Sequence, residues 1–254
     1  MRVLLTLLLA FLTAAAIPEE ELDVPYVPTP AEAVERMLDM AEVGPSDHLI
    51  DLGSGDGRIA VAAARRGARA LGVDIDPDRI GEAAAAARLA GLETRARFRR
   101  QDLFETPLRE ASVVSMYLLP DINLRLRPRL LTELRPGARV VSHNFDMGDW
   151  RPDAVAEVGA SRLYLWVVPA VAGGSWSLRL ADGTILPLEL EQRFQEVTGS
   201  LGGAAVSDTR LRGTSLRFAA AGRTFQGVVG DAAIEPDPAA PAGAERSWIA
   251  TRVN

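Results

Sequence analysis

The sequence contains no cysteine and no lysine, and it has only two histidines. Without cysteine there are no disulfides, thiolate zinc sites, iron–sulfur clusters or cysteine nucleophiles. All 28 basic residues are arginine, which also excludes a Walker-type phosphate lysine and a Schiff-base lysine. His48 and His143 are too few for a three-histidine metal site, and we expect no metal.

The charge balance argues against nucleic acid as a partner. The net charge is −6, whereas a protein that holds nucleic acid through a large surface is basic. Apolar residues make up 48% and charged residues 24% of the chain, which is ordinary globular composition. A length of 254 residues allows one large domain or two small ones.

The N-terminus resembles a targeting segment. Arg2 precedes an apolar run from Val3 to Ile17, which ends in three alanines and is followed by acidic residues from Glu19. This order is typical of a secretory signal, and the run is shorter than the ~20 residues that span a membrane. Three interpretations of residues 1–17 remain open: a cleaved signal, an uncleaved anchor, and an ordinary apolar N-terminus.

Residues 18–170 have the alternation of an α/β domain. A Thr29-x-x-Glu32 capping box, with Pro30 at the first helical position, predicts an initial helix. Strands are expected over residues 48–52, 70–74, 95–99, 111–118, 139–143 and 163–168. Helices are expected over 58–66, from 77 to just before Gly91, and before Pro136 with a restart at Pro128. This pattern predicts a Rossmann-like parallel sheet with helices on both faces.

Residues 171–254 contain no further helix pattern and predict a small all-β domain, a meander or a barrel. Strands are expected over residues 175–180, 188–198, 209–211, 215–218, 225–229 and 248–253. Phe194, Phe218, Phe225 and Trp248 are the candidates for its interior. No catalytic motif is present there, so we expect this domain to serve packing or partner contact.

The motif Asp51-Leu-Gly-Ser-Gly-Asp-Gly57 follows a predicted strand and opens a predicted helix. Its glycines allow a sharp turn and close approach of a ligand, and the helix N-terminus behind them favours a negative group. A dinucleotide fingerprint would place its third glycine at position 58, which is Arg58. The spacing therefore departs from the NAD pattern. A glycine-rich turn that occurs by chance in a doubly wound domain is the alternative interpretation.

This loop resembles motif I of the class I S-adenosylmethionine (SAM) methyltransferases, and two later landmarks follow. Gly72-Val-Asp74 ends the second strand, and Gln101-Asp102-Leu103 follows the third. The resemblance implies SAM as cofactor, with Asp74 on the ribose hydroxyls and Asp102 and the Leu103 N–H on the adenine. The cofactor-binding residues that it implies are Val27, Pro28, Asp51, Gly53, Ser54, Gly55, Gly57, Asp74, Ile75, Asp102 and Leu103.

A narrower resemblance covers residues 24–168. It rests on Val-Pro-Tyr-Val-Pro at 24–28, Val-Val-Ser-Met-Tyr-Leu-Leu-Pro at 113–120, and Ala-Arg-Val-Val-Ser-His-Asn-Phe through Asp153. These segments resemble the protein-lysine methyltransferases of ATP synthase subunit c and the adenine nucleotide translocase. The resemblance implies a protein substrate, possibly a small membrane protein, and membrane proximity through the N-terminus. Asp74 stands where that family usually has glutamate, and the β-rich part is not in the family pattern.

Tyr26 and Tyr117 are the predicted catalytic residues, although each also suits simple packing. A lysine acceptor must lose a proton, which an apolar slot between residues 26–28 and 116–120 would favour. Asp56 is either a site residue or a helix cap, and His143 is either a base or a satisfied buried histidine. A loop with Asp146, Asp149 and Trp150 is a further candidate for substrate contact.

Two functions therefore stand side by side. The first is a SAM-dependent methyltransferase acting on protein lysine, and the second is an exported, non-catalytic binding protein. Because SAM is cytosolic, a catalytic domain implies either an inner-membrane anchor with the domain in the cytosol, or an exported, periplasmic enzyme with a supply of SAM. Acidic residues after the apolar run, with Arg2 before it, favour export.

Overall fold

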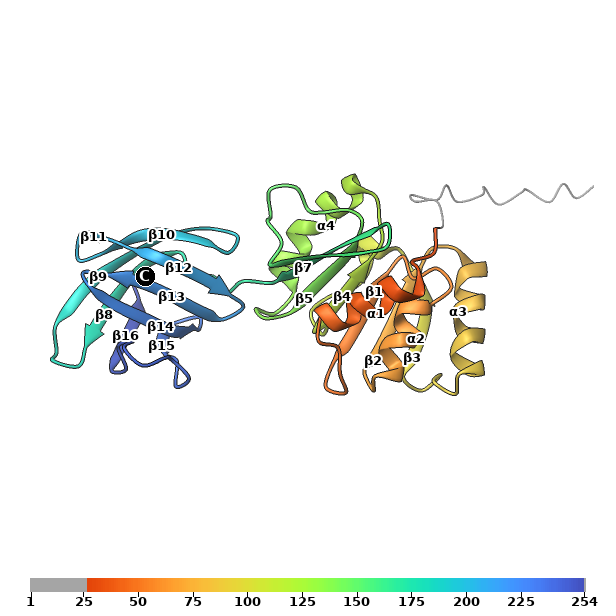
Figure 1. Cartoon of the computed structure of the whole chain (residues 1–254), viewed down its shortest axis with the longest axis horizontal. Helices are drawn as coiled ribbons and strands as arrows, with labels where there is room; N and C mark the ends of the chain where they lie inside the picture. The colour runs from red at the N-terminus through yellow and green to blue at the C-terminus, as the bar shows by residue number, and fades with distance from the viewer. Residues whose placement is uncertain (1–26, 254) are drawn as a thin grey trace, which may run out of the picture.

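The computed structural model describes residues 27–253, which form two β-sheets that follow one another along the chain (Figure 1). The predictions for residues 1–17 and for Tyr26 lie outside the described residues. Within residues 27–253, every helix is too short or too polar to cross a membrane. The chain passes from the first sheet to the second between Val167 and Gly174.

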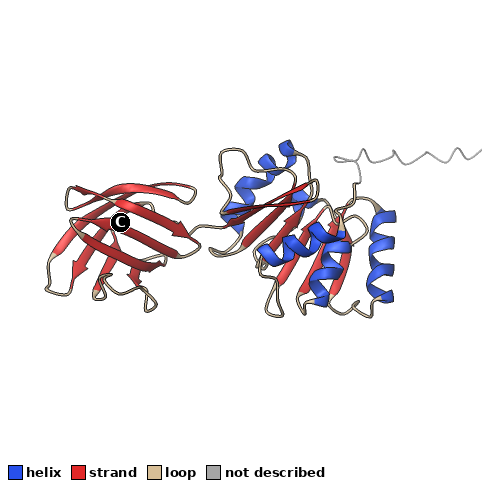
Figure 2. Ribbon diagram, in the orientation of Figure 1, coloured by secondary structure: helices blue, strands red, loops and turns tan. Residues whose placement is uncertain are grey.

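The first domain is a mixed sheet of seven strands with helices on both faces (Figure 2). Strands β1 to β5 are parallel, and β7 and β6 extend the sheet antiparallel beside β5 in the order β3-β2-β1-β4-β5-β7-β6. The elements are α1 (Ala31–Met40), β1 (His48–Leu52), α2 (Arg58–Arg65), β2 (Arg69–Asp74), α3 (Pro77–Leu89), β3 (Ala96–Arg100), η1 (Leu103–Glu105), β4 (Val113–Met116), α4 (Pro120–Glu133), β5 (Arg139–His143), β6 (Ala154–Val158) and β7 (Ser161–Val167). The predicted Rossmann-like α/β class is confirmed.

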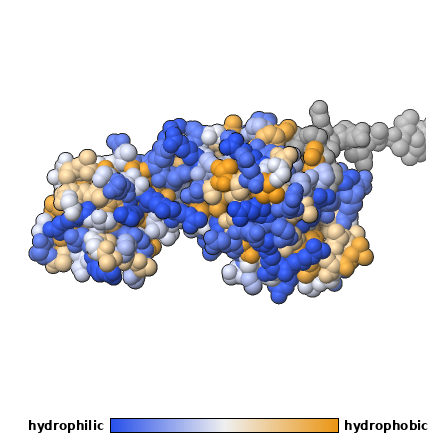
Figure 3. All heavy atoms as spheres, viewed as in Figure 1, coloured by the Kyte–Doolittle hydropathy of each residue, from blue (hydrophilic) through white to orange (hydrophobic). Residues whose placement is uncertain are grey.

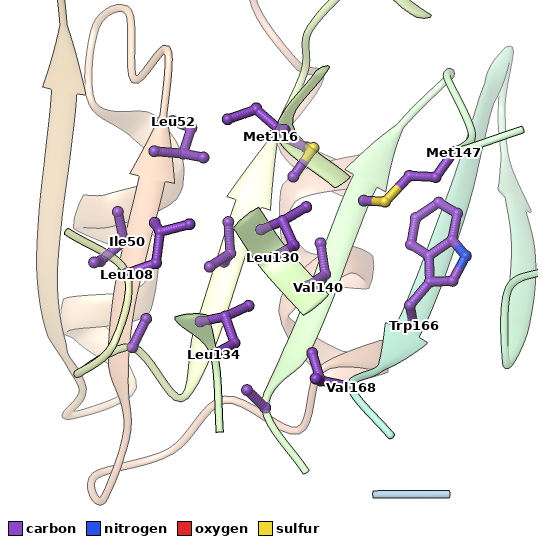
Figure 4. Close-up of a cluster of buried hydrophobic side chains, with 14 of the residues drawn as sticks. Ile50, Leu52, Leu108, Met116, Leu130, Leu134, Val140, Met147, Trp166 and Val168 are labelled. Carbon is purple, nitrogen blue, oxygen red and sulfur yellow. The ribbon is translucent and has the colours of Figure 1, made fainter. Parts of the chain in front are cut away.

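A buried apolar layer joins α4 to one face of this sheet. Figure 4 shows Leu130 of α4 beside Val140 of β5, with Ile50 and Met116 from the neighbouring strands. Each of these side chains is at most 2% exposed, and burial of such a side chain contributes about 1.5–3 kcal/mol. Helices α1 and α2 cover the opposite face with a second cluster. The parallel strands are thus packed between two apolar layers.

The strand order places a ligand crevice between β1 and β4. From β1 the chain continues outward through β2 and β3, then returns to β4 on the other side. Open α/β sheets bind ligands at such a reversal, outside the carboxyl ends of the strands. The segments that follow β1, β2, β3 and β4 therefore meet at one edge of the sheet.

The second domain is an antiparallel sheet of nine strands, whose edge strand β12 also lies against β10 and nearly closes it. Its interior holds Phe218 and Phe225 stacked at 4.9 Å, with Trp248 edge-on to Phe225 at 5.4 Å. Aromatic pairs in these orientations add ~1 kcal/mol beyond their burial. The strands are β8 (Gly174–Leu180), β9 (Ile185–Arg193), β10 (Glu196–Leu201), β11 (Ala204–Ala205), β12 (Ser207–Arg212), β13 (Ser215–Ala220), β14 (Arg223–Val229), β15 (Ala233–Pro236) and β16 (Trp248–Arg252).

Two predictions about helix ends are wrong. Pro30, not Thr29, is the N-cap of α1, and no side chain caps this helix; the Thr29 hydroxyl instead bonds His143 at 3.1 Å. Helix α4 runs through Pro128 without a restart. A proline inside a helix costs about 3 kcal/mol, and the burial of Ile122, Leu126 and Leu130 offsets that cost.

One predicted strand is in fact a hairpin. The range 188–198 divides into β9 and β10, which pair across a two-residue turn at Phe194 and Gln195. Phe194 does not fill the second domain, because its ring packs on the core of the first domain. Strands β6 and β15 were not predicted, since exposed alanine and glutamate weaken their alternation.

Candidate active site

A pocket opens at the carboxyl ends of the parallel strands, which is where open α/β sheets bind small molecules. It collects the segments that follow β1, β2, β3 and β4, together with residues 27–29 ahead of α1. Ten of the predicted cofactor-binding residues line it, and so does Tyr117: Val27, Pro28, Asp51, Gly53, Ser54, Gly55, Asp74, Ile75, Asp102 and Leu103. Gly57 is the predicted residue that does not.

The glycine loop owes its shape to left-handed backbone angles. Gly53, Gly55 and Gly57 have φ of 72°, 52° and 80°, which glycine adopts without steric cost. The N–H groups of Gly53 and Ser54 both donate to the carbonyl of Val73 at 2.9 Å. At Gly57 a Cβ would lie 2.6 Å from the Phe98 ring. Gly57 therefore serves the packing of α2 against β3 rather than ligand contact.

Two carboxylates are oriented by backbone N–H groups at the pocket edge. Asp74 accepts from Gly55 N–H at 2.8 Å and from Asp76 N–H at 3.0 Å, one bond to each oxygen. Asp102 accepts from Phe104 N–H at 2.7 Å and so caps the short helix η1. These bonds fix both side chains in place, so each presents a preset acceptor to a ligand in the pocket.

Asp51 is the most perturbed acid of the pocket. Its side chain is 1% exposed, and one oxygen accepts from the Ser115 hydroxyl at 2.8 Å. Burial raises the pKa of Asp51 to about 7, with nearby Asp74 and Asp56 adding to the shift and the Ser115 bond opposing it. Its other oxygen has no hydrogen-bond partner among residues 27–253. A buried acceptor of this kind is costly unless a ligand supplies a donor.

The pocket residues fit SAM. The cofactor carries a positive sulfonium and a protonated amino group, and the orphaned Asp51 oxygen and buried Ser54 hydroxyl offer it polar contacts. The acids Asp51, Asp74 and Asp102 give the lining a negative field that favours a cation. Apolar walls at Val27, Pro28, Ile59, Val73, Ile75, Leu103 and Leu118 leave room for the rings of a nucleoside.

Tyr117 lies where the pocket meets the end of β4. Its hydroxyl oxygen accepts from the Asn144 side-chain amide at 3.3 Å. Its ring lies 4.0 Å from the His143 ring and 6.2 Å from Phe145. Asn144 has a left-handed φ of 62°, which asparagine adopts more readily than most residues other than glycine. Asn144 belongs to the motif quoted above, but the sequence assigned it no role.

His143 does not line the pocket. It is 2% exposed, its Nδ1 bonds the Thr29 hydroxyl at 3.1 Å, and burial lowers its pKa to about 4. The imidazole is therefore neutral near pH 7 and ties residues 27–29 to the end of β5. The Thr29 carbonyl also accepts from Arg58 at 2.8 Å, so this segment is held over the pocket from two sides.

Of the remaining predicted site residues, one lines the pocket and the others lie near the contact between the two domains. Asp56 lines the pocket and also bonds the N–H and guanidinium of Arg58. Asp146, Asp149 and Trp150 do not line it. The Asp149 carboxylate pairs with arginines of both domains, and Trp150 is fully buried.

Comparisons with known proteins agree on the first domain. Residues 51–154 match the ANTKMT methyltransferase domain. A protein-lysine N-methyltransferase of Saccharolobus islandicus is 44% identical over 151 residues, covering 57% of this chain and 94% of that protein. The adenine nucleotide translocase lysine N-methyltransferase of Mus musculus is 39% identical, and the match covers 58% of this chain and 64% of the mouse protein.

A solved structure adds the bound ligand. The RNA methyltransferase of Salinibacter ruber, in complex with S-adenosyl-L-homocysteine, is 50% identical to this chain, with a TM-score of 0.56. The match covers 56% of this chain and 94% of the Salinibacter protein. The fold, the pocket and the relatives together identify a SAM-dependent methyltransferase domain.

Proposed function

This chain belongs to the family of protein-lysine N-methyltransferases, and on that premise we propose that it methylates lysine side chains of a protein with SAM as donor. The observation that carries the proposal is the pocket, where a buried acid with one unpaired oxygen and an ordered tyrosine lie at the same strand edge. The same features disfavour the non-catalytic alternative, because a domain without a cofactor gains nothing from a buried carboxyl oxygen that has no hydrogen-bond partner.

SAM, when bound, supplies an electrophilic methyl group on a sulfonium. The chain holds donor and acceptor in line, which alone lowers the barrier of such a transfer substantially. Asp74 and Asp102 are fixed by backbone N–H groups and orient the nucleoside. Asp51 would accept a hydrogen bond from the amino group of SAM, whose positive charge would compensate that of the carboxylate. Residues 27–29 close over the pocket through Thr29 and limit the access of water.

The acceptor lysine must arrive neutral, with its lone pair toward the methyl carbon. Pro28, Leu118 and the ring of Tyr117 form an apolar wall at the pocket, and such surroundings lower the pKa of an amine. Asn144 donates to one lone pair of the Tyr117 oxygen, which leaves another for an amine N–H. That contact would turn the nitrogen lone pair away from the tyrosine and toward the donor.

The absence of lysine from this chain makes the test direct. The protein and methyl-tritiated SAM are incubated with three acceptor fractions in separate reactions. The fractions are membrane proteins, soluble proteins and RNA from bacterial cells. We expect label in protein, recovered after acid hydrolysis as methyllysine. The enzyme holds no lysine, so every methyllysine comes from an acceptor. Label confined to RNA, or to another amino acid, would overturn the proposal; the net charge of −6 argues for protein.

We propose further that the acceptor is a small membrane protein and that residues 1–17 bring the enzyme to the same membrane. The support is the apolar run in the sequence and the resemblance described above. Cell fractionation of the full chain, followed by protease treatment of spheroplasts, tests this. A membrane-bound, protease-protected domain supports anchoring on the cytosolic side. A cleaved protein in the periplasm would contradict it and favour export.

A further inference from the structure

The structure assigns a role to the second domain: we propose that its β9–β10 turn positions the loop that borders the acceptor side of the site. The turn comprises residues 193–196, and the loop, residues 144–153, joins β5 to β6. This inference rests on the proposed function and adds a positioning element outside the methyltransferase domain. Residues 144 and 145 of the loop contact Tyr117, and residues 149–151 contact the turn.

The turn contacts the second half of the loop in three ways. The Phe194 ring stacks on Trp150 with centroids 6.1 Å apart. Arg193 forms an ion pair with Asp149 at 2.5 Å. Gln195 donates from its side chain to the Arg151 carbonyl at 2.6 Å. Backbone, charge and ring contacts thus converge on three consecutive loop residues.

Asp149 joins both domains in one ion-pair cluster. Its second oxygen pairs with Arg127 of α4, which also donates to the Met147 carbonyl at 2.8 Å. The arginines hold the pKa of the Asp149 carboxyl below its ordinary value, led by the Arg127 hydrogen bond. Because Asp149 is half exposed and Arg193 largely exposed, the pairs supply geometry more than stability.

Hydrogen bonds hold the segment that connects the two domains in place. The Gln192 side chain donates to the carbonyls of Ala170 and Phe194 and accepts from the N–H groups of Ala172 and Gly173, at 2.7–3.0 Å. Arg252 donates to the carbonyls of Val171 and Gly173. The ribbons join through one segment, whereas Figure 3 shows the side chains of both domains meeting in a continuous surface. The turn therefore reaches the loop in a fixed orientation.

The first half of the loop reaches the site. Asn144 donates to the Tyr117 hydroxyl, and the Phe145 ring stacks on Tyr117 at 6.2 Å. The Phe145 carbonyl accepts from Ser142 at 2.7 Å and from Asn123 at 3.2 Å. The first domain thus holds residues 144–146, whereas residues 149–151 contact both domains: Arg127 and Trp166 on one side and the turn on the other. The first half of the loop therefore borders Tyr117.

The backbone at the tip of the turn supports a function for the ring. Phe194 is the first residue of a two-residue turn and has a φ of 55°. A bulky side chain rarely adopts this conformation, and glycine is common at the first position of such turns. The strain is retained because the ring contacts Trp150.

The test removes the aromatic ring of Phe194 while the backbone of the turn keeps its conformation. Phe194→Gly removes the contact with Trp150 and relieves the strained φ, so the second domain should stay folded. Ala221→Gly is the matched control, because Ala221 also lies at a turn with a φ of 49°. Phe194→Tyr preserves the ring and should behave like the unaltered chain.

For Phe194→Gly we expect at least tenfold faster amide hydrogen exchange over residues 147–151. SAM affinity should stay within about twofold, and methylation of solubilised membrane proteins should lose about tenfold in kcat/KM, mainly through KM. Unchanged loop exchange would overturn the proposal, and so would a released loop with unchanged transfer. If the unaltered chain binds SAM but forms no methyllysine, the proposed function fails, while the exchange comparison still decides whether the turn holds the loop.

Discussion

Protonation of Asp51 should control how tightly the protein binds SAM near neutral pH. Burial raises the pKa of Asp51 to about 7, and its unpaired oxygen accepts well only when ionised. Below pH 7 each unit of pH makes ionisation about 1.4 kcal/mol more costly. The Asp51 contribution to SAM affinity should therefore fall about tenfold between pH 8 and pH 6.

Calorimetric titration of SAM at pH 6, 7 and 8 measures this dependence, with Asp51→Asn as the comparison. The amino group of SAM titrates near pH 7.7–8.0 itself and is the proposed partner of Asp51, so the change between pH 6 and pH 7, where that amino group stays protonated, is the part that reports Asp51. Burial lowers the pKa of His143 to about 4, which removes that group from the range. The reasoning would be refuted if the affinity ratio of the two proteins did not change with pH.

The same substitution should have an opposite effect on the stability of the protein without SAM. The pKa of Asp51 is about 7 in the folded protein, compared with the ordinary value of 3.8 that it has in the unfolded chain. Its protonated form is thus the favoured one in the folded state, and stability falls as pH rises from about 4 to 7. The loss reaches about 4 kcal/mol above pH 7. Asp51→Asn should therefore raise the melting temperature at pH 8 while it weakens SAM binding.

Other substitutions separate the parts of the site. Asp74→Ala should weaken SAM binding at least a hundredfold in calorimetry, with an unchanged circular dichroism spectrum, because the ribose hydroxyls lose a charged acceptor; retained affinity would show that the assignment is wrong. Thr29→Val removes the bond to His143 and should weaken SAM binding about fivefold, whereas Thr29→Ser should not; equal losses would point to packing instead. Tyr117→Phe should keep SAM affinity and lower the methylation rate about tenfold or more; an unchanged rate would exclude a role for its hydroxyl.

The sequence predicted those parts of the fold that depend on local pattern. Strands β1 and β5 were predicted at His48–Leu52 and Arg139–His143 and are observed there, because buried parallel strands form continuous apolar runs. The glycine loop was predicted for a similar reason, since its spacing encodes backbone angles. These features need no knowledge of distant contacts.

The wrong predictions concern residues whose positions depend on contacts distant in the sequence. Thr29 lost its predicted capping role to His143, a partner 114 residues away. Phe194 left the predicted interior of its own domain for Trp150 of the other. In both cases the local pattern was satisfactory, and a tertiary contact outweighed it. No periodicity or capping rule contains that information.

The end of β5 shows why the acceptor side was the hardest part to predict. Ser142 holds the Phe145 carbonyl, His143 holds Thr29, and Asn144 holds the Tyr117 hydroxyl. Successive side chains of a strand point to opposite faces of the sheet, so consecutive residues can reach separate segments. In the sequence these residues form an unremarkable polar end to an apolar strand. In the fold they fix the segment over the cofactor pocket, the predicted catalytic tyrosine and the loop that the second domain grips. Substitutions at the end of β5 should therefore alter cofactor and acceptor binding together, whereas changes in the glycine loop should alter cofactor binding first.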